Sequence, residues 1–187
     1  MSSSHGTYFT SDGSKASFDQ AMTSWIPIAH EVLTEVAGKY NRTITYSELT
    51  EIVQERSGIR TNMLISNWSG KLLERVARRT AEGEEPPLTS LCVHQDGTIG
   101  EGYFRAPKSV PSDTTSDVDD LAAQHRLLCY QRYAEDLPHD GGTPTLTRQV
   151  AKARSRQVRA AAARPRAMCQ VHFVEMAAAG TCDECEE

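Results

Sequence analysis

The stretch from Thr43 to Phe104 constrains the fold of this 187-residue chain more than any other part, because it is patterned as two helices followed by a hairpin. Thr45 and Glu48 form a capping box, in which each side chain satisfies a backbone N–H at the start of a helix. Apolar residues at helical spacing mark the inner face of each expected helix: Leu49, Ile52 and Val53 in the first, and Trp68, Leu72 and Val76 in the second, which is expected from about Asn67 to Arg79.

A hairpin is expected after these two helices. Pro86-Pro87 interrupts the chain, and two short strands flank Asp96-Gly97, a dipeptide that is typical of a type I′ turn. Two crossed helices followed by a hairpin is the plan of a winged helix. The sequence therefore predicts a winged-helix-like domain, whose fold is mainly α with a small β-hairpin.

A further helix is expected before this stretch, where six apolar residues recur at helical intervals: Phe18, Met22, Ile26, Ala29, Leu33 and Val36. Pro27 lies inside the pattern, so this helix either kinks there or begins near Trp25. Gly38 is expected to end it. The helix would then pack across the other two and complete a three-helix core.

Charge is strongly segregated along the chain. The net charge of -5 argues against a general nucleic-acid binder, for which a basic domain is expected. Between Arg56 and Arg79, however, six basic residues face a single acid, Glu74. From Arg148 to Arg166 there are seven basic residues and no acid. Such segregation can serve binding, so the net charge alone does not decide the function.

The second helix of the expected pair carries a basic stripe, because Lys71, Arg75 and Arg78 follow one another at i, i+4 and i+7. In a helix-turn-helix the second helix enters the major groove and presents such side chains to phosphates and bases. A solvated face on a structural helix is the alternative interpretation. The expected DNA-binding residues are Asn67, Lys71, Arg75, Arg78 and Arg79.

The C-terminus carries the spacing of a metal site. Cys169 and His172 have two residues between them, and nine residues later Cys182 and Cys185 repeat that spacing. Two such pairs complete a tetrahedral Cys3His zinc site that resembles a minimal zinc ribbon, and coincidental cysteines are the competing interpretation. Four protein ligands leave no open position, so the expected Zn2+ is structural.

The central stretch resembles the winged-helix domain of the alkylguanine-DNA alkyltransferases and the alkyltransferase-like proteins. The matching features are Thr45-Tyr46 at the start of a helix, Gly70 within the next helix, and the turn at Asp96-Gly97 followed by Ile99-Gly100. The resemblance covers about 60 residues, one third of the chain. It implies a DNA-binding fold.

The residues that carry the chemistry of that family are replaced in this chain. The family has a Pro-Cys-His-Arg motif where this sequence reads Leu88-Thr89-Ser90-Leu91. Thr89 stands where the family has its nucleophilic cysteine and Ser90 where it has the histidine base. Asn67 stands near the position of the arginine that fills the gap left by a flipped base. The resemblance therefore implies no alkyl transfer, since the activated thiolate is missing.

Other catalytic schemes have little support in the sequence. Cys92 and His94 are two residues apart in an expected strand and would share a face as a Cys/His pair. Buried free thiols are the preferred interpretation of Cys92 and Cys129. No P-loop or dinucleotide-binding glycine motif occurs. The protein is expected not to be an enzyme.

The expected organisation has five parts: a disordered arm at 1–17, a winged-helix-like domain at 18–136 that ends in a helix capped by Ser116, a linker at 137–146, a basic helical connector at 147–166, and a short zinc-ribbon-like motif at 167–187. The expected function is non-enzymatic binding of duplex DNA. The alternative is a protein–protein adaptor that docks through the zinc ribbon and the basic helix. A cytoplasmic location is expected, because residues 1–15 lack the apolar stretch of a secretory signal and no apolar run approaches the roughly 20 residues that span a membrane.

Overall fold

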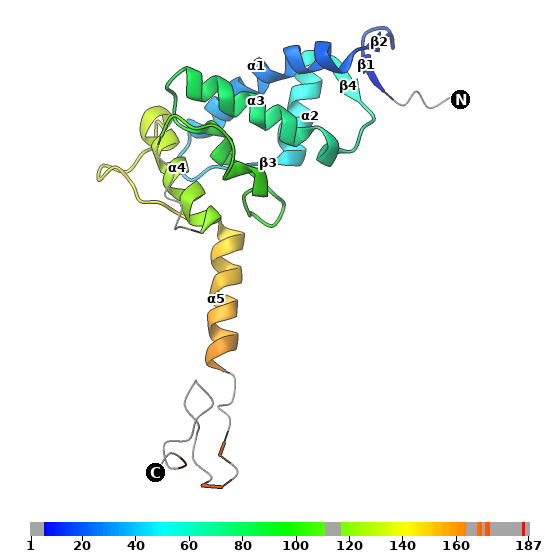
Figure 1. Cartoon of the computed structure of the whole chain (residues 1–187). Coiled ribbons are helices and arrows are strands. Elements are labelled where there is room, and N and C mark those ends of the chain that lie inside the picture. The colour runs from blue at the N-terminus through cyan, green and yellow to red at the C-terminus, as the bar shows by residue number, and fades with distance from the viewer. Residues whose placement is uncertain (1–5, 111–116, 164–167, 170, 173–184, 186–187) are drawn as a thin grey trace. The chain divides into compact units, whose positions relative to one another are not determined.

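The computed structural model of the protein describes residues 6–110, 117–163, 168–169, 171–172 and 185 (Figure 1). The chain divides into two compact units, Met1–Val150 and Ala151–Glu187. The helices are α1 (Phe18–Ala37), α2 (Tyr46–Ser57), α3 (Ser69–Glu82), α4 (Val118–Tyr133) and α5 (Arg148–Ala162), with short 3-10 helices η1 (Ile65–Asn67), η2 (Leu88–Leu91) and η3 (Glu101–Tyr103). The strands are β1 (Thr7–Phe9), β2 (Lys15–Ala16), β3 (Ile44–Thr45), β4 (Ile59–Thr61) and β5 (Cys92–Val93).

Helix α1 begins earlier than the position of Pro27 suggests. Ser17 and Gln20 form a capping box, in which each side chain accepts a hydrogen bond from the backbone N–H of the other residue. Pro27 lies inside the helix on its exposed face, so the Thr23 carbonyl that loses its intrahelical partner is on the solvent side. The expected start near Trp25 is therefore wrong, whereas Gly38 caps the helix as predicted.

Helix α2 confirms the predicted capping box. The Thr45 hydroxyl accepts the Glu48 N–H at 3.2 Å, and the Glu48 carboxylate accepts the Thr45 N–H at 2.8 Å. The pKa of Glu48 is lowered, mainly because its carboxylate accepts the Thr45 backbone N–H and secondly because it accepts the Thr45 hydroxyl. Gly58 ends the helix with φ 66°, a left-handed conformation that favours glycine.

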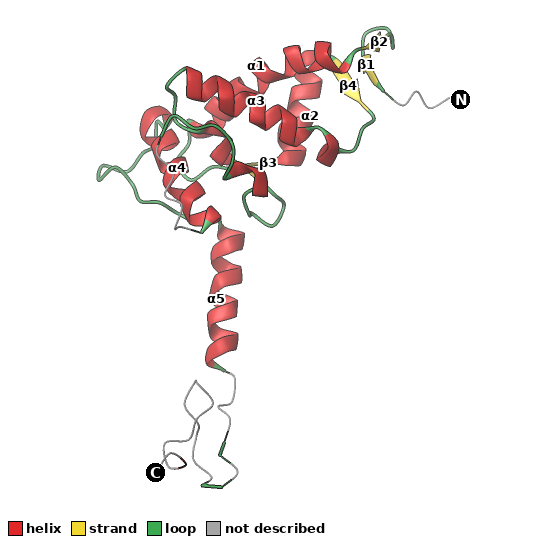
Figure 2. Ribbon diagram, in the orientation of Figure 1, coloured by secondary structure: helices red, strands yellow, loops and turns green. Residues whose placement is uncertain are grey.

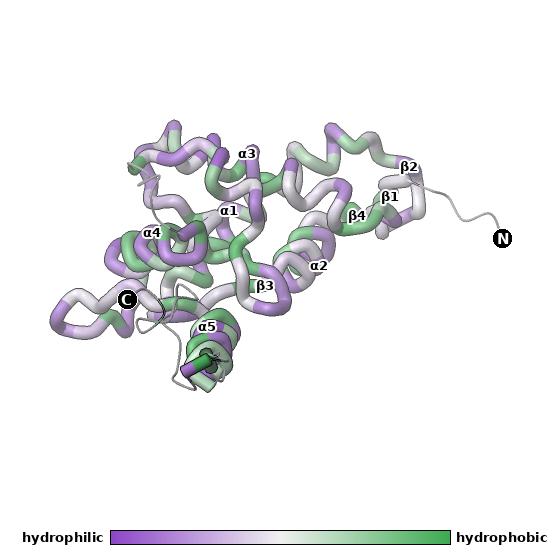
Figure 3. The backbone as a smooth tube through the Cα atoms, turned by 60° about the horizontal axis from the view of Figure 1, so that its bottom comes forward, coloured by the Kyte–Doolittle hydropathy of each residue, from purple (hydrophilic) through white to green (hydrophobic). Residues whose placement is uncertain are grey.

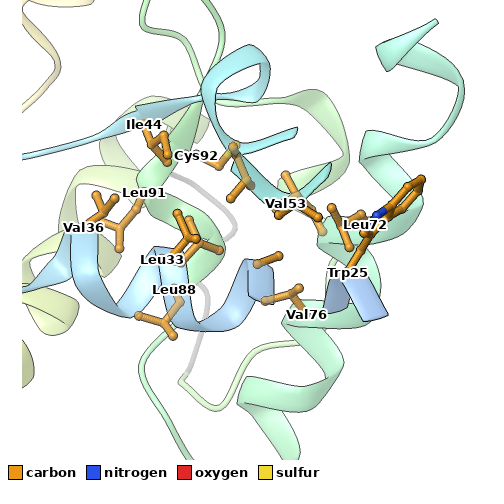
Figure 4. Packing of buried hydrophobic residues seen from close by; sticks show 14 of the residues in the cluster. Trp25, Leu33, Val36, Ile44, Val53, Leu72, Val76, Leu88, Leu91 and Cys92 are labelled. Atoms are coloured by element: carbon orange, nitrogen blue, oxygen red, sulfur yellow. The ribbon is translucent and has the colours of Figure 1, made fainter. Parts of the chain in front are cut away.

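The core of the first unit lies where α1 packs against both α2 and α3, as the sequence predicts. The rings of Trp25 and Trp68 meet there with their centroids 4.5 Å apart. Figure 4 shows the buried side chains around α1: Leu33 and Val36 from α1 itself, Val53 from α2, Leu72 and Val76 from α3, Leu88 and Leu91 from η2, and Cys92 from β5. The inner faces that were read from helical spacing are therefore confirmed.

The N-terminal segment departs from the disordered arm expected at 1–17. Residues 7–9 and 15–16 form β1 and β2, which join β4 in an antiparallel sheet of order β2-β1-β4 (Figure 2). A tight turn connects β1 to β2, in which the Asp12 carboxylate accepts the Ser14 N–H and Gly13 has φ 73°. The partner strand β4 is about 50 residues away along the chain, so local composition gave no sign of the pairing.

The expected hairpin is smaller than predicted and differs in its pairing. Strand β5 pairs in parallel with β3, with Ile44 opposite Cys92, and the antiparallel pairing around the turn is a single bridge between Val93 and Ile99. The turn is not type I′, which needs positive φ at both central residues. Among the described non-glycine residues only Asn41 and Glu84 have positive φ, so Asp96 lacks it.

The turn itself has a different and well-defined geometry. Gly97 has φ 81° and donates its N–H to the His94 carbonyl at 2.9 Å, while the His94 N–H donates to the Thr98 carbonyl at 2.8 Å. This is the pattern of a type I turn followed by a left-handed glycine in a bulge. The Asp96 carboxylate stabilises it by accepting the Thr98 N–H.

Helix α4 and the segment after it complete the first unit. Asp117 caps α4, with its carboxylate accepting the Asp119 N–H at 2.9 Å; the expected cap, Ser116, lies outside the described residues. The segment 137–146, expected to be a linker, is held to the domain by Tyr40. The Tyr40 hydroxyl donates to the Thr143 carbonyl and accepts the Thr143 N–H, at 3.1 and 3.0 Å. The division between the two units accordingly follows Val150.

The described fold is mainly helical with small β elements, as the sequence predicts. The expected basic helix at 147–166 is present as α5 over Arg148–Ala162, and residues 164–166 lie outside the described part of the chain. Most of the expected zinc-ribbon-like segment at 167–187 also lies outside it. Among the described residues no helix is both long enough and apolar enough to span a bilayer.

Candidate nucleic-acid interface and metal cluster

Helix α3 has one apolar face and one charged face, and Figure 3 shows hydrophobic and strongly hydrophilic residues alternating along it. Its buried residues are Ser69, Leu72, Leu73, Val76, Ala77 and Thr80. The residues exposed on the other side include Lys71, Glu74, Arg75, Arg78 and Arg79. The predicted stripe of Lys71, Arg75 and Arg78 therefore lies on the solvent side of the helix.

The charges of this stripe are largely uncompensated. Arg78 approaches the Glu74 carboxylate at 3.4 Å, but both side chains are more than half exposed, at 61% and 57%, so the pair contributes little stability. Lys71, Arg75 and Arg79 form no ion pair with any residue in the described part of the chain. The other basic residues of the segment differ, since Arg56 and Arg60 pair with carboxylates of Glu35 and Glu51.

A groove of about 600 Å³ runs beside the stripe, between the charged side of α3 and the start of α1. Phe18 and Met22 of α1 form its apolar wall. Its polar residues are Lys71, Glu74, Arg75, Arg78, Arg79 and Glu82, four cations and two acids. The groove therefore combines an excess of positive charge with an apolar surface.

Asn67 lies just before α3, at the end of η1, and lines a different and larger cavity of about 1060 Å³. This open cavity is lined by the start of α2, by η1, by the first turns of α3, by Thr89 and His94, and by the segment 99–107. Lys71 and Glu74 line both the cavity and the groove. The structure thus places Asn67 and the stripe on one continuous side of the unit, with Lys71 between them.

Aromatic stacking shapes one wall of the cavity. The ring of Tyr46 lies on that of His94, and burial raises the pKa of the Tyr46 phenol to about 12. The hydroxyl of Tyr46 lies so close to Gly100 that a β-carbon at that position would overlap it. The phenol therefore stays neutral at physiological pH and remains available as a hydrogen-bond donor.

The cavity was not predicted, but its lining overlaps the positions that carry the family resemblance. Tyr46, Asn67, Gly70, Thr89, Ile99 and Gly100 all line it. These residues come from four segments of the chain, and only their tertiary arrangement brings them together. The signal that pointed to them was the resemblance to the alkyltransferase family, which rests on single positions along the sequence.

No cysteine is among the described residues that line this cavity. Thr89 is buried and carries a hydroxyl, not a thiol. Cys92 is fully buried in β5, as predicted, and burial raises its pKa, so its thiolate is scarce. His94 is exposed and stacked on Tyr46, so Cys92 and His94 do not share the environment that a Cys/His pair needs.

In the second unit, three of the four predicted metal ligands lie together. Their ligand atoms all lie within 4.8 Å of one another. The sulfurs of Cys169 and Cys185 are 3.8 Å apart, and His172 Nδ1 is 3.9 Å from the first and 3.4 Å from the second. The fourth predicted ligand, Cys182, lies outside the described residues.

These separations fit a tetrahedral metal. Zn–S bonds of about 2.3 Å and Zn–N bonds of about 2.0–2.1 Å place two sulfurs about 3.8 Å apart and a sulfur about 3.6 Å from a nitrogen. The His172 N–H also points to the Cys169 sulfur at 3.4 Å, a hydrogen bond that would favour its thiolate. Cys169, His172 and Cys185 are therefore close enough to bind one metal ion, and the donor set is compatible with zinc.

Comparisons of this chain with protein-family models, with curated proteins and with solved structures found no match.

Proposed function

We propose that this protein binds duplex DNA without acting on it chemically, through a winged-helix-like domain in which α3 is the contact helix. The observation that carries the proposal is the exposed stripe of Lys71, Arg75 and Arg78, of which only Arg78 has an acidic partner among the described residues. Uncompensated cations are available to neutralise phosphates and release their counterions.

The dimensions of the stripe suit this role. From Lys71 to Arg78 the helix advances seven residues, which is about 10 Å at 1.5 Å per residue. That length fits a major groove about 12 Å wide, into which such a helix is inserted in helix-turn-helix proteins. The apolar face of α3 is fixed to the core by Leu72 and Val76, so its charged side is held outward.

The acidic net charge of the whole protein is compatible with this proposal, because the acids lie elsewhere. The segment from Arg56 to Arg79 has one acid, Glu74, against six basic residues. The affinity gained from phosphate contacts depends on the charge of the surface that touches the DNA, not on the net charge of the protein. The acidic net charge therefore does not decide against phosphate contacts at α3.

The cavity beside α3 supports binding without catalysis. It offers a recess next to the contact helix where an unstacked nucleotide would be read, with Asn67 at its edge and the Tyr46 hydroxyl inside it. Thr89 supplies no thiolate there, and the fully buried Cys92 does not line the recess. The resemblance to alkyltransferase-like proteins points in the same direction.

The second part of the proposal is a structural zinc ion held by Cys169, His172 and Cys185, with Cys182 as the fourth ligand. The support is the match between the ligand-atom separations and tetrahedral geometry. A fully protein-ligated ion has no open coordination position for substrate. Its binding free energy would fold a segment that is too short to bury a core.

The test of the proposed function is binding of the full chain to a random-sequence duplex over a series of salt concentrations. A DNA-binding protein gives a logarithm of affinity that falls linearly with the logarithm of the salt concentration. Absence of measurable binding at low salt would overturn the proposal and favour the protein–protein adaptor.

A further inference from the structure

Helix α5 carries the same basic pattern as the contact helix α3. Lys152, Arg156 and Arg159 follow one another at i, i+4 and i+7, with the residue types and spacing of Lys71, Arg75 and Arg78. Because 3.6 residues make one turn, these three side chains share one side of α5. All three are exposed. They are called the α5 stripe below.

The two helices differ in what surrounds the charges. Helix α3 buries six residues, whereas Val150 is the single buried residue of α5, at its first turn. Helix α3 also carries Glu74 and Glu82, whereas α5 contains no acidic residue. The two stripes carry the same three cations, and α5 differs from α3 in having no acid beside them.

The charges of α5 have a cost for the helix that carries them. Like charges three or four residues apart destabilise a helix by about 0.2–0.5 kcal/mol for each pair. Helices of this length are marginal in water unless packing supports them, and α5 has little packing. An anionic partner along the stripe would remove the repulsion and stabilise the helix.

We propose that the α5 stripe is a second contact surface for the phosphates of duplex DNA, an inference that rests on the proposed function. Lys152 to Arg159 covers about 10 Å of helix, which matches about three phosphates at 3.4 Å along one strand. The basic stripe complements a phosphate backbone, and no acid within α5 opposes such a partner.

The rest of α5 favours nucleic acid over a membrane surface. An amphipathic membrane helix places Trp, Phe or Leu opposite its basic side. On α5 the side opposite the stripe holds Arg154 together with alanine and glutamine, and Val158 is the exposed large apolar residue. Such a helix can bind an anionic partner, but it has no apolar face that would insert into a bilayer.

The test uses two matched triple variants of the full chain and a fluorescent duplex. One variant carries Lys152→Gln, Arg156→Gln and Arg159→Gln, and the other carries Lys71→Gln, Arg75→Gln and Arg78→Gln. If all three residues of a stripe contact phosphates, the salt slope should fall by about 2.7 for that variant, at about 0.9 for each contact. Arg154→Gln is the control, because Arg154 lies on the opposite side of α5 and is partly buried.

The outcomes separate this inference from the proposed function. A reduced salt slope in both triple variants supports both the α5 contact and the proposed function. Loss in the α3 variant alone, with α5 still helical by circular dichroism, overturns the α5 contact and leaves the proposed function standing. Loss in the α5 variant alone supports α5 and overturns the assignment of α3. Slopes that change in neither variant, or an equal loss from Arg154→Gln, overturn the α5 contact.

A second measurement does not depend on the salt slope. Neutral glutamines remove the repulsion within α5, so the α5 variant should be more helical than the unmodified chain before duplex is added. The unmodified chain should gain helicity when duplex is added, and the α5 variant should not. Equal gains in the two proteins, or binding to anionic vesicles with no response to duplex, would overturn the α5 contact.

Discussion

The rings of Tyr46 and His94 stack with their centroids 4.9 Å apart and their planes inclined by 23°. This contact joins the first residue of α2 to the end of β5 and forms one wall of the larger cavity. Gly100 lies against the Tyr46 hydroxyl, and a β-carbon there would also lie 3.6 Å from His94 Nε2. The position of the Tyr46 ring therefore depends on the absence of a side chain at residue 100.

The first prediction follows from this packing. Gly100→Ala should destabilise the protein by about 1–3 kcal/mol, because its β-carbon overlaps the Tyr46 hydroxyl. Gly102→Ala is the matched control, since nothing lies within 4 Å of that position, and its effect should stay within about 0.5 kcal/mol. Combining Gly100→Ala with Tyr46→Phe should recover most of the loss. Urea unfolding measures all three, and equal effects at both glycines would contradict the packing.

The second prediction concerns the cap of α2. Thr45→Ala should cost about 1 kcal/mol, because it removes the side-chain oxygen that accepts the Glu48 N–H. The pKa of Glu48 is lowered in the folded state. The stabilisation that the ionised Glu48 gives the folded protein is therefore fully present above pH 4.5, its ordinary pKa, and is lost as the pH falls through the lowered pKa. The difference between the two proteins should therefore shrink in acid. An unchanged difference at low pH would show that Glu48 is not coupled to the cap.

The third prediction concerns the cysteines of the core. Cys92 and Cys129 should react with thiol reagents only after unfolding, because both are fully buried, and burial raises the pKa of Cys129 to about 12. The measurement uses a chain in which Cys169, Cys182 and Cys185 are changed to Ser, so that only these two thiols remain. Rapid labelling of the native protein would restore Cys92 as a candidate nucleophile.

The fourth prediction concerns the metal. The protein should bind one zinc ion per chain, and Cys182→Ser or His172→Ala should weaken binding strongly, because each removes a ligand. Cobalt substitution should give the absorption of a thiolate-bound tetrahedral ion. His139→Ala is the control, since His139 belongs to the first unit and is not one of the three clustered ligands. A Cys182→Ser protein that keeps its full metal content would exclude the proposed fourth ligand.

The fifth prediction concerns α3. Replacing Arg75 and Arg78 together by Ala should weaken binding to all duplexes similarly and reduce the salt slope by close to two, at about 0.9 for each contact. The cost in stability should stay within about 0.5 kcal/mol, because both side chains are exposed.

A control for this pair comes from the same segment of sequence. Arg56→Ala with Arg60→Ala removes the same number of charges, but both arginines already pair with carboxylates. That variant should bind DNA with nearly the original slope. Equal losses from the two pairs would show that the effect is one of total charge and not of the α3 surface.

The elements that could be predicted from the sequence are those that local patterns determine. The capping box at Thr45, the stop at Gly38 and the inner positions of α3 depend on residues within a few positions of one another. The structure confirms all three. The basic stripe on α3 was found for the same reason, because helical spacing alone decides which residues share a side.

The features that were missed depend on contacts between distant segments. The pairing of β1 with β4 joins residues about 50 positions apart, and the parallel pairing of β3 with β5 does the same. The buried Arg126 is another example, since it donates to the carbonyls of Ser90 and Thr145 from a helix whose pattern suggests no buried charge. The cavity likewise required segments whose proximity no local pattern encodes.

The pairing of β1 with β4 affects the local stability of the segment that precedes α3. β4 lies in the connection between α2 and α3, and its edge is held by a strand of three residues near the N-terminus. Because this pairing has few backbone hydrogen bonds, it can open while the helical core stays intact. Amide protons of residues 7–9 and 59–61 should then exchange with solvent well before those of α1. Each opening would free the connection ahead of α3, which β1 otherwise holds through its pairing with β4.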